Sequence, residues 1–446
     1  MKDKSFAIFN RDALLFFSTL LTGIVIARQL GPEMMGVWTI LLLIPGYAEA
    51  IGRLKFDVSS VYFLGQKKAA LGELTFLLHI LATLAALVMV LVFIGNFEWF
   101  YKQLFQNVEV DVRAFAYTIL SIIPLRLIYL NYSYLLVAIE DFRAYNVQVI
   151  LQALVTSFFS IGLILVFGLG IIGALIGSII GLTVSIVYGA VKVQGIERIN
   201  PGLNPRLILS MAKYAFAQYL SGLIGYFQGN IASLIAAFFM HPAQIAFYAI
   251  GKSICEVANR MVPVAISTVL FPLVSKTVNA SESTLLTARL FRITLLILSV
   301  SSLSLAVLIK PVVLLLYGSE YLPLITPFII MLPGVVLSQS SSVFASWFSG
   351  VGRPDLLSKI AIFPLLVQIA GAWILIPEFG INGASASFLL SALLLFLFTM
   401  ICFVTMGKLR FSDMIIRFED IVTVWKFFIE KLSQIIQVIV TNIPGR

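Results

Sequence analysis

Long apolar runs separated by short polar segments dominate this chain. A helix needs about 20 apolar residues to span a bilayer once, and runs of this length recur along the whole sequence, so they predict an all-α membrane protein of about twelve spanning helices. The expected spans are 12–30, 37–64, 73–95, 114–137, 147–168, 171–193, 213–239, 243–274, 290–309, 322–347, 357–376 and 381–406. The first run is interpreted as an uncleaved helix, because it lacks a convincing small-residue cleavage site.

The composition supports this interpretation and excludes several classes of protein. Hydrophobic residues make up 60% of the 446 residues and charged residues only 11%, whereas a soluble chain is about 25% charged. Cys255 and Cys402 both lie in apolar runs, and His79 and His241 are too few and too far apart to suggest a metal site. Neither a disulfide framework nor a bound metal is expected.

The basic residues give the expected orientation. With the N-terminus in the cytoplasm, 21 of the 30 Lys and Arg residues fall on the cytoplasmic side, and both termini are inside. This asymmetry is the positive-inside signature of a multi-pass protein. It also explains the net charge of +9 without a nucleic-acid partner. The four basic residues that fall outside are Arg28, Lys102, Arg113 and Lys310.

The two halves of the sequence repeat at an offset of 210 residues. Pro32 pairs with Pro242 and Arg143 with Arg353, and the run 170–174 recurs as 380–384. A duplicated six-helix unit has an even number of crossings, so both copies share one orientation. The sequence therefore predicts two pseudo-symmetric six-helix lobes, 1–200 and 201–406, with a cavity between them that opens by alternating access.

The last segment, 407–446, has a different pattern. From Met414 to Val440, apolar residues recur at helical spacing, and polar residues, Asp420 among them, fill the other side. This pattern predicts an amphipathic helix on the cytoplasmic membrane surface.

Charged residues in the second expected helix are candidates for a functional site, because such groups are costly inside a membrane. Glu49, Arg53 and Asp57 are spaced four apart. This spacing predicts that they lie on one face of the helix, over about 12 Å of its axis. Lys55 would lie on roughly the opposite side.

A second charged set lies in the eighth expected helix. Lys252, Glu256 and Arg260 show the same spacing with opposite signs, while Arg126 lies in the fourth helix and Arg28 at the outer end of the first. The pairs spaced four apart could simply neutralise one another and join helices.

Mutual pairing does not account for the whole intramembrane set, however. Six cations face three anions, which leaves a surplus of three positive charges. A water-filled cationic cavity for an anionic substrate explains this surplus, and arginine suits phosphate because its planar fork donates two parallel hydrogen bonds. The predicted substrate-binding residues are Arg28, Arg53, Arg126, Lys252 and Arg260. The carboxylates Glu49, Asp57 and Glu256 are candidates for coupling to H⁺ or Na⁺, and no other cofactor is expected.

Two glycine patterns have structural interpretations. The run from Gly168 to Gly173 matches GxGxxG, but no strand precedes it and a membrane helix follows, so it is interpreted as a tight turn between spans. Gly173, Gly177 and Gly181 form a ridge of small residues that favours close helix packing. No Walker loop, nucleophile elbow or HExxH motif occurs, so ATP-driven pumping by this chain alone is not expected. The helices, repeat and intramembrane charges together favour a transporter and not an enzyme.

Two motifs resemble a known family. The segment 26–33 with Gly36 and Trp38, and the late run 376–386, resemble those of polysaccharide flippases. These are members of the multidrug/oligosaccharidyl-lipid/polysaccharide (MOP) exporter superfamily, related to the multidrug MATE exporters and the lipid II flippases. The likeness covers about residues 1–406.

The resemblance implies a MATE-like pair of six-helix lobes around a V-shaped cavity in the cell (inner) membrane of a bacterium or archaeon. The implied substrate is an undecaprenyl-pyrophosphate-linked oligosaccharide exported for O-antigen or capsule. Candidate partners are the membrane lipids, a polysaccharide polymerase and a chain-length regulator. In the lipid II flippases, cavity arginines come from the first, second and eighth helices, where Arg28, Arg53 and Arg260 occupy comparable places; Arg28 alone lies inside a matching motif.

Other functions remain open at this point. A drug or metabolite antiporter of the same superfamily would commonly carry cations, for which an acidic surplus is expected. A scaffold in a polysaccharide assembly complex has no need for six buried cations. A membrane glycosyltransferase would need a catalytic base, and no acidic pair in an external loop suggests one.

Overall fold

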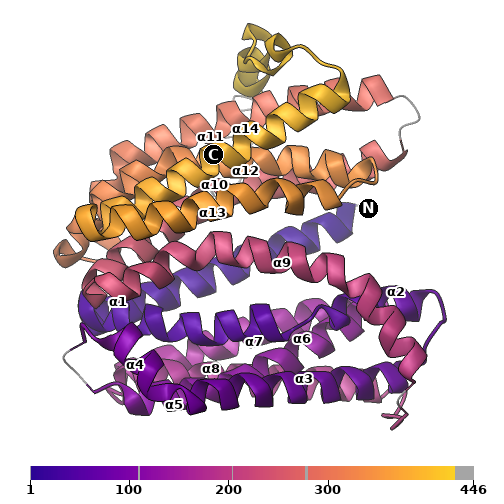
Figure 1. Ribbon diagram of the computed structural model, residues 1–446, viewed down its shortest axis with the longest axis vertical. Helices are drawn as coiled ribbons and strands as arrows, with labels where there is room; N and C mark the ends of the chain where they lie inside the picture. The colour runs from indigo at the N-terminus through magenta and orange to yellow at the C-terminus, as the bar shows by residue number, and fades with distance from the viewer. Residues whose placement is uncertain (1, 109–110, 203, 277–279, 427–446) are drawn as a thin grey trace, which may run out of the picture. The chain divides into compact units, whose positions relative to one another are not determined.

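The protein is all-α in the computed structural model, which describes residues 2–108, 111–202, 204–276 and 280–426 (Figure 1). No strand occurs in these ranges. The helices of the first half are α1 (Lys2–Gly52), α2 (Phe56–Gly65), α3 (Leu71–Gly95), α4 (Phe97–Phe105), α5 (Arg113–Leu120), α6 (Ile122–Ala138), α7 (Phe142–Leu165), α8 (Gly170–Gln194) and α9 (Pro205–Phe239). The second half contains α10 (Pro242–Lys276), α11 (Ala280–Leu316), α12 (Ile325–Gly350), α13 (Asp355–Phe379) and α14 (Ile381–Gly407), with 3₁₀ turns at Ser319–Leu324 and Phe411–Met414.

Ten of the described helices are long and apolar enough to cross a membrane. The first of them, Phe17–Gly52, contains parts of two expected spans. Helix α10, which contains the charged residues Lys252, Glu256 and Arg260, is not among the ten. The chain is thus a multi-pass membrane protein, as predicted, and its helices are consistent with the expected twelve crossings.

A backbone turn at Gly31 separates the first two expected spans within α1. Gly31 has φ 71° and ψ 173°, a conformation open to glycine but strained for other residues, and Pro32 follows it. Proline at the start of a helix loses no hydrogen bond, because its missing N–H would be unpaired there anyway. The predicted junction between the two spans is therefore present as a kink in a long helix.

The structure divides into two compact units. The first comprises 1–249, 312–323 and 376–384, and the second comprises 250–311, 324–375 and 385–446. Short segments from the second half of the sequence thus belong to the first unit. The lobe boundaries expected from the repeat, 1–200 and 201–406, and the separate tail from 407 to 446 remain predictions.

Within the first unit, α7 and α8 pack closely through the glycine ridge. A Cβ atom at Gly177 would lie 2.5 Å from the backbone nitrogen of Ser160, and one at Gly181 would lie 2.9 Å from that of Thr156. Gly168, in the turn before α8, and Gly170, the first residue of α8, have φ of 65° and 52°. Both glycine interpretations, a tight turn and close packing, are confirmed.

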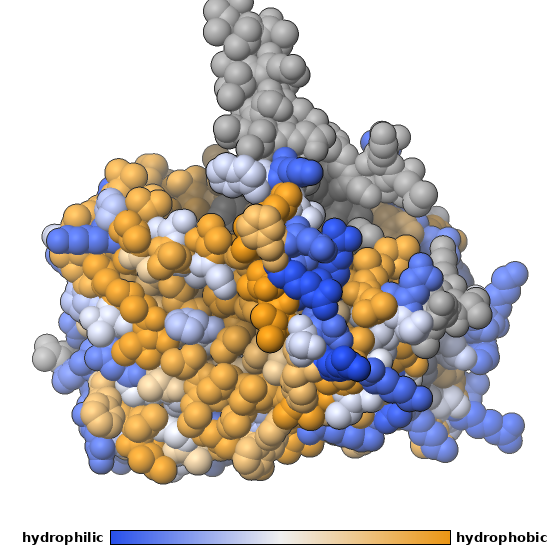
Figure 2. All heavy atoms as spheres, turned by 90° about the horizontal axis from the view of Figure 1, so that it is seen from above, coloured by the Kyte–Doolittle hydropathy of each residue, from blue (hydrophilic) through white to orange (hydrophobic). Residues whose placement is uncertain are grey.

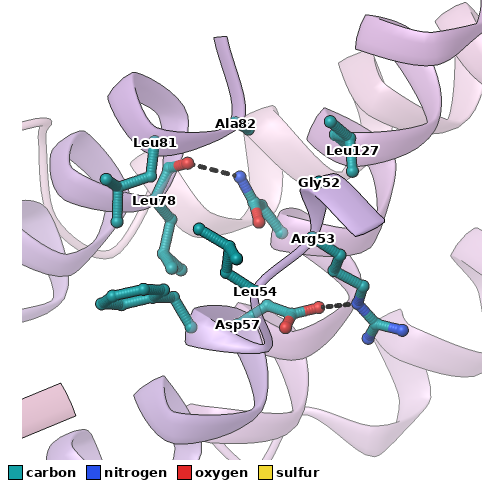
Figure 3. A pocket seen from close by; sticks show the side chains of 10 residues that line it. Gly52, Arg53, Leu54, Asp57, Leu78, Leu81, Ala82 and Leu127 are labelled. Atoms are coloured by element: carbon teal, nitrogen blue, oxygen red, sulfur yellow. Dashed lines mark hydrogen bonds and ion pairs between the residues drawn. The ribbon is translucent and has the colours of Figure 1, made fainter. Parts of the chain in front are cut away.

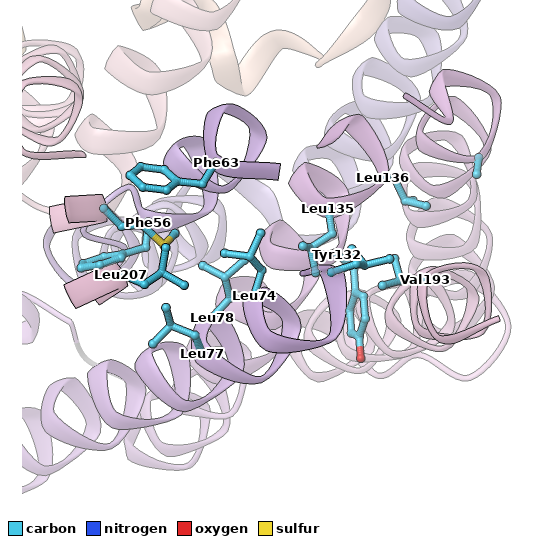
Figure 4. Packing of buried hydrophobic residues seen from close by; sticks show 13 residues of the cluster. Phe56, Phe63, Leu74, Leu77, Leu78, Tyr132, Leu135, Leu136, Val193 and Leu207 are labelled. Atoms are coloured by element: carbon cyan, nitrogen blue, oxygen red, sulfur yellow. The ribbon is translucent and has the colours of Figure 1, made fainter. Parts of the chain in front are cut away.

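A hydrophobic cluster joins α2, α3, α6 and α9 in the same unit (Figure 4). Phe56 and Phe63 of α2 pack in it with Leu74 and Leu78 of α3 and with Leu135 of α6. Because α2 is only ten residues long, this packing is what holds its first turn, with Asp57, in place.

The second unit has an aromatic core around α11, α12 and α14. The ring centroid of Phe344 lies 4.6 Å from that of Phe291 and 4.8 Å from that of Phe403. Met414, beyond the end of α14, is buried in the same cluster. The first residues of the tail are therefore part of this core.

The outward-facing surface is apolar, as expected for contact with lipid. Leu84, Leu87, Val88 and Leu91 of α3 are each more than half exposed and recur at helical spacing. Hydrophobic side chains also cover much of the face shown in Figure 2. Such surfaces are rare on soluble monomers.

Candidate functional site

The candidate site in the first unit lies at a break between α1 and α2. Helix α1 ends at Gly52 and α2 begins at Phe56, with Arg53 between them. Leu54 and Lys55 have φ of 50° and 58°. This left-handed conformation costs roughly 1–2 kcal/mol per non-glycine residue, so the surrounding packing must hold it.

This break corrects one sequence prediction. The second span was expected to run without interruption over 37–64, with Glu49, Arg53 and Asp57 on one helical face, but the helix is broken at 53–55. Interrupted membrane helices place backbone groups and side chains at binding sites in many transporters. Helix α10, by contrast, continues through 263–265, the positions that correspond to 53–55 at the repeat offset.

Arg53 and Asp57 form a tight, nearly dry ion pair across the break. Arg53 Nε donates to Asp57 Oδ2 at 2.6 Å, and the side chains are only 13% and 1% exposed. The Val58 amide donates to Asp57 Oδ1 at 2.9 Å, so the carboxylate also caps the first turn of α2. The Arg53 guanidinium lies 4.9 Å from the ring centroid of Tyr134. Its Nη2 has no hydrogen-bond partner among the described residues.

A small cavity adjoins this ion pair (Figure 3). It measures about 20 Å³ and is lined by Arg53, Asp57 and Asn131 together with apolar residues of α3 and α6. The Asn131 side chain donates to the carbonyl of Leu78 at 2.8 Å. This volume has room for about one water molecule, so the cavity is too small for a substrate.

Glu49 pairs with Arg126 and not with its helical neighbour Arg53. Arg126 Nε donates to Glu49 Oε2 at 2.7 Å, and the two side chains are 44% and 19% exposed. This pair joins α1 to α6 and is wetter than the Arg53–Asp57 pair. Within this first charged set, the pairing expected from four-residue spacing is therefore found for Arg53 and Asp57 but not for Glu49.

Lys55 makes no ion pair with any described carboxylate. Its side chain runs along α9, where a Cβ on Gly222 would lie 2.8 Å from Lys55 Cε. Beside it, the Tyr219 hydroxyl donates to the carbonyl of Ile51 at 3.1 Å. Helix α9 thus packs over the break and leaves room for the lysine.

Arg28 contacts the end of α11 in the first unit. Its Nε donates to the carbonyl of Leu316 at 2.9 Å, and its Nη2 donates to that of Leu315. In return, the Tyr321 hydroxyl donates to the carbonyl of Ala27 at 2.8 Å. A cation at a helix C-terminus is stabilised by the unpaired carbonyls there. These contacts join the end of the first span to segment 312–323.

The second unit contains Lys252, Glu256 and Arg260. Lys252 Nζ lies 3.4 Å from Glu256 Oε1, a longer contact than in the other two pairs, and Glu256 is 44% exposed. The lysine also lies 5.7 Å from the ring centroid of Phe388. Arg260 is exposed and makes no ion pair with the part of the chain that the structure describes.

The predicted site residues thus divide into cations that pair with a carboxylate and cations that do not. Three of the cations, Arg53, Arg126 and Lys252, each meet one carboxylate, while Arg28, Lys55 and Arg260 have no described carboxylate partner. Sequence reasoning missed Tyr134 and the packing of α9 on the break. No local pattern signals either feature, because both depend on contacts between helices far apart in the sequence.

Comparison with solved structures identifies the class of fold. The lipid II flippase MurJ in an inward closed conformation superposes with a TM-score of 0.75 at 15% identity, covering 96% of this chain and 92% of that one. An inward-facing MATE family multidrug resistance transporter of the MOP superfamily gives 0.72 at 14%, covering 88% and 96%. A MOP superfamily transporter from Pyrococcus furiosus gives 0.62 at 12%, covering 92% and 95%; a reversed polarity of its binding pocket is described as suggesting a different function. The chain has the fold of the MOP superfamily transporters.

The family follows from the sequence. Residues 25–326 match the family model described as polysaccharide biosynthesis protein. Since this match covers more than half of the chain, the protein belongs to the polysaccharide biosynthesis protein family. The resemblance inferred from the two motifs is thereby confirmed. Comparison with curated protein sequences gives no match.

Proposed function

We propose that this protein is a flippase that moves an undecaprenyl-pyrophosphate-linked oligosaccharide from the inner to the outer leaflet of a prokaryotic cell membrane by alternating access. The product would supply surface polysaccharide biosynthesis. The family match supports the polysaccharide role, and the fold supports transport. Both termini would be cytoplasmic, and a polysaccharide polymerase and chain-length regulator would act on the product.

The observation that carries this proposal is the set of cations left without carboxylates. Among the described residues, Lys55 and Arg260 have no ion-pair partner, and the hydrogen bonds of Arg28 go to carbonyl oxygens. Unpaired cations in a membrane protein are costly unless water or an anionic ligand stabilises them. A pyrophosphate would supply that stabilisation, and the lipid-linked sugars of the proposed substrate carry one.

The three carboxylates are the proposed coupling groups. Asp57 is held by Arg53 and by the Val58 amide, and Glu49 is held by Arg126. Glu256 has the longest ion-pair contact of the three, 3.4 Å, and is substantially exposed. A proton or Na⁺ would therefore displace the basic partner most readily at Glu256, where that partner is Lys252.

Arg260 offers the sharpest test in cells. Replacing Arg53 would strand Asp57 in a dry site and so confuse function with folding, whereas Arg260 is exposed and has no described partner. In cells lacking their own flippase, Arg260→Gln should insert normally, lose surface polysaccharide and accumulate the lipid-linked intermediate. Lys310→Gln, which neutralises an exposed cation outside this set, should export normally. Full export by Arg260→Gln at matched expression would contradict the cationic site.

An ion-coupled drug or metabolite antiporter is the second candidate, because MATE transporters share the fold. It predicts efflux of cationic dyes from whole cells that depends on Glu256. Dye efflux that is lost in Glu256→Gln, with surface polysaccharide unaffected, would favour this function over the flippase.

A further inference from the structure

The segment that follows α14 is folded onto the second unit. Residues 411–414 form a 3₁₀ turn and 418–426 a helix. The amphipathic helix predicted from Met414 therefore begins four residues later, at Phe418, and its predicted residues 427–440 lie outside the described part. Met414 is buried in the aromatic core of α11, α12 and α14. The segment is therefore an integrated part of the unit.

A buried ion pair fixes the orientation of this segment. Arg292 of α11 donates from Nε to Asp420 Oδ2 at 2.6 Å and from Nη2 to Oδ1 at 3.3 Å. Its Nη1 donates to the carbonyl of Asp413 at 2.6 Å. The Arg292 and Asp420 side chains are only 8% and 2% exposed. The sequence pattern placed Asp420 on the polar side of the helix, opposite the apolar positions. In the structure this aspartate is buried against Arg292, a partner 128 residues away that the local pattern could not reveal.

The opposite side of the segment is an exposed hydrophobic stripe. Phe418 is 78% exposed and Trp425 65% exposed. At 100° per residue, 418, 421 and 425 lie on one helical face, roughly opposite Asp420. The stripe consists of Phe418, Ile421 and Trp425, and Phe411 and Ile415, which precede this helix, are exposed as well.

Positive charges accompany the stripe. Lys408, Arg410, Arg417 and Lys426 are all exposed. Asp413 is paired with Arg417 at 2.8 Å, and Asp420 is neutralised by Arg292. Of the carboxylates in this segment, Glu419 alone is exposed, so the surface of the segment is positive.

We infer that residues 408–426 form a binding surface for anionic membrane lipids, with the hydrophobic stripe immersed and the cations at the headgroups. The bilayer is the occupant because α14 is a membrane-spanning helix that ends at Gly407, which leaves the segment at the membrane boundary. Exposed apolar and basic residues together match an anionic interface. The Arg292–Asp420 pair sets the angle at which the stripe meets the lipid. This inference does not depend on the transported substrate.

Fluorescent labelling of the full chain tests the lipid contact. In a background with Cys255→Ala and Cys402→Ala, a polarity-sensitive probe is attached through Ile421→Cys, or through Glu419→Cys as the matched control. The protein is placed in phosphatidylcholine vesicles with and without phosphatidylglycerol. The probe at 421 should become shielded and quenched by lipid-borne quenchers, more strongly with phosphatidylglycerol and less strongly at high salt, while the probe at 419 stays in water.

Two results would overturn the inference. One is a 421 probe that remains water-accessible in both vesicle types. The other is shielding that rises with the protein-to-lipid ratio and ignores phosphatidylglycerol, which would indicate contact with a second copy. Neutralising two cations with Arg417→Gln and Lys426→Gln should abolish the phosphatidylglycerol dependence, and a persisting dependence would refute their role.

The orientation by Arg292 has its own test. Asp420→Asn should raise the mobility of the 421 probe and reduce its immersion. Glu419→Gln, which removes the neighbouring exposed carboxylate, should change neither. Equal effects of the two substitutions, or none from either, would show that the ion pair does not orient the segment. Thermal unfolding of both variants separates this effect from misfolding.

Discussion

The Arg53–Asp57 pair at the break between α1 and α2 should contribute strongly to stability. Asp57→Asn keeps an oxygen that can accept from the Val58 amide, but it removes the charge that balances Arg53. With the side chains only 13% and 1% exposed, a stranded arginine should cost roughly 3–5 kcal/mol of unfolding free energy. The more exposed Arg126–Glu49 pair provides the matched comparison, and Glu49→Gln should cost only about 0.2–1 kcal/mol.

Equilibrium unfolding in mixed detergent micelles measures both values under one condition. The double variant with Arg53→Gln and Asp57→Asn should recover much of the loss, because it leaves no unbalanced charge in the site. Equal costs for Asp57→Asn and Glu49→Gln would refute the reasoning. So would a double variant less stable than Asp57→Asn alone, since the second substitution would then have removed a favourable group.

Three further predictions concern packing, hydrogen bonding and pH. Gly177→Ala should destabilise the protein by about 1–3 kcal/mol, because the added Cβ would meet the backbone of Ser160. In Gly162→Ala the added Cβ meets nothing within 4 Å, so this control should be neutral or stabilising. Thermal unfolding compares the two variants. Tyr321→Phe leaves the carbonyl of Ala27 without its donor and should cost about 1–3 kcal/mol, whereas Tyr117→Phe, at an exposed position, should cost little by the same measurement. Burial opposes ionisation of Asp420, but hydrogen bonds from Arg292 and from the Arg417 amide outweigh it and hold its pKa below the ordinary value. The contribution of the Asp420 carboxylate to the free energy of unfolding should therefore be complete above the ordinary carboxyl pKa of about 3.9. It should be lost as the pH falls through the lowered pKa of Asp420 in the folded protein. Asp420→Asn should remove this pH dependence from the measured unfolding free energy.

Local patterns predicted much of this fold. Hydrophobic runs located the long helices, and glycines marked the turn at Gly31 and the α7–α8 contact. These features depend on residue type and spacing within one or two helices. The family motif around Arg28 was also recognisable from sequence alone.

Features that depend on distant contacts were not predictable in this way. Residues 53–55 include neither glycine nor proline, so residue type does not signal the left-handed turn at Leu54 and Lys55. Packing against α9 and α3 overrides the helix propensity of these residues. The partner of Glu49 lies 77 residues away, and that of Asp420 lies 128 residues away. Four-residue spacing placed Glu49 in a charged cluster, and the amphipathic pattern placed Asp420 on a polar face, but neither pattern could identify a partner so far away in the sequence.

The central claim is transport of a pyrophosphate-linked oligosaccharide by a cationic site, and reconstituted vesicles test it most directly. The measurement is the rate at which an undecaprenyl-pyrophosphate-linked oligosaccharide becomes accessible on the opposite leaflet, for the wild type, Arg260→Gln and the control Lys310→Gln. The account predicts transfer by the wild type and by the control, and a rate about tenfold or more lower for Arg260→Gln, as expected for the loss of one charge-assisted contact. No transfer by the wild type in any imposed ion gradient, or equal rates for all three proteins, would contradict it.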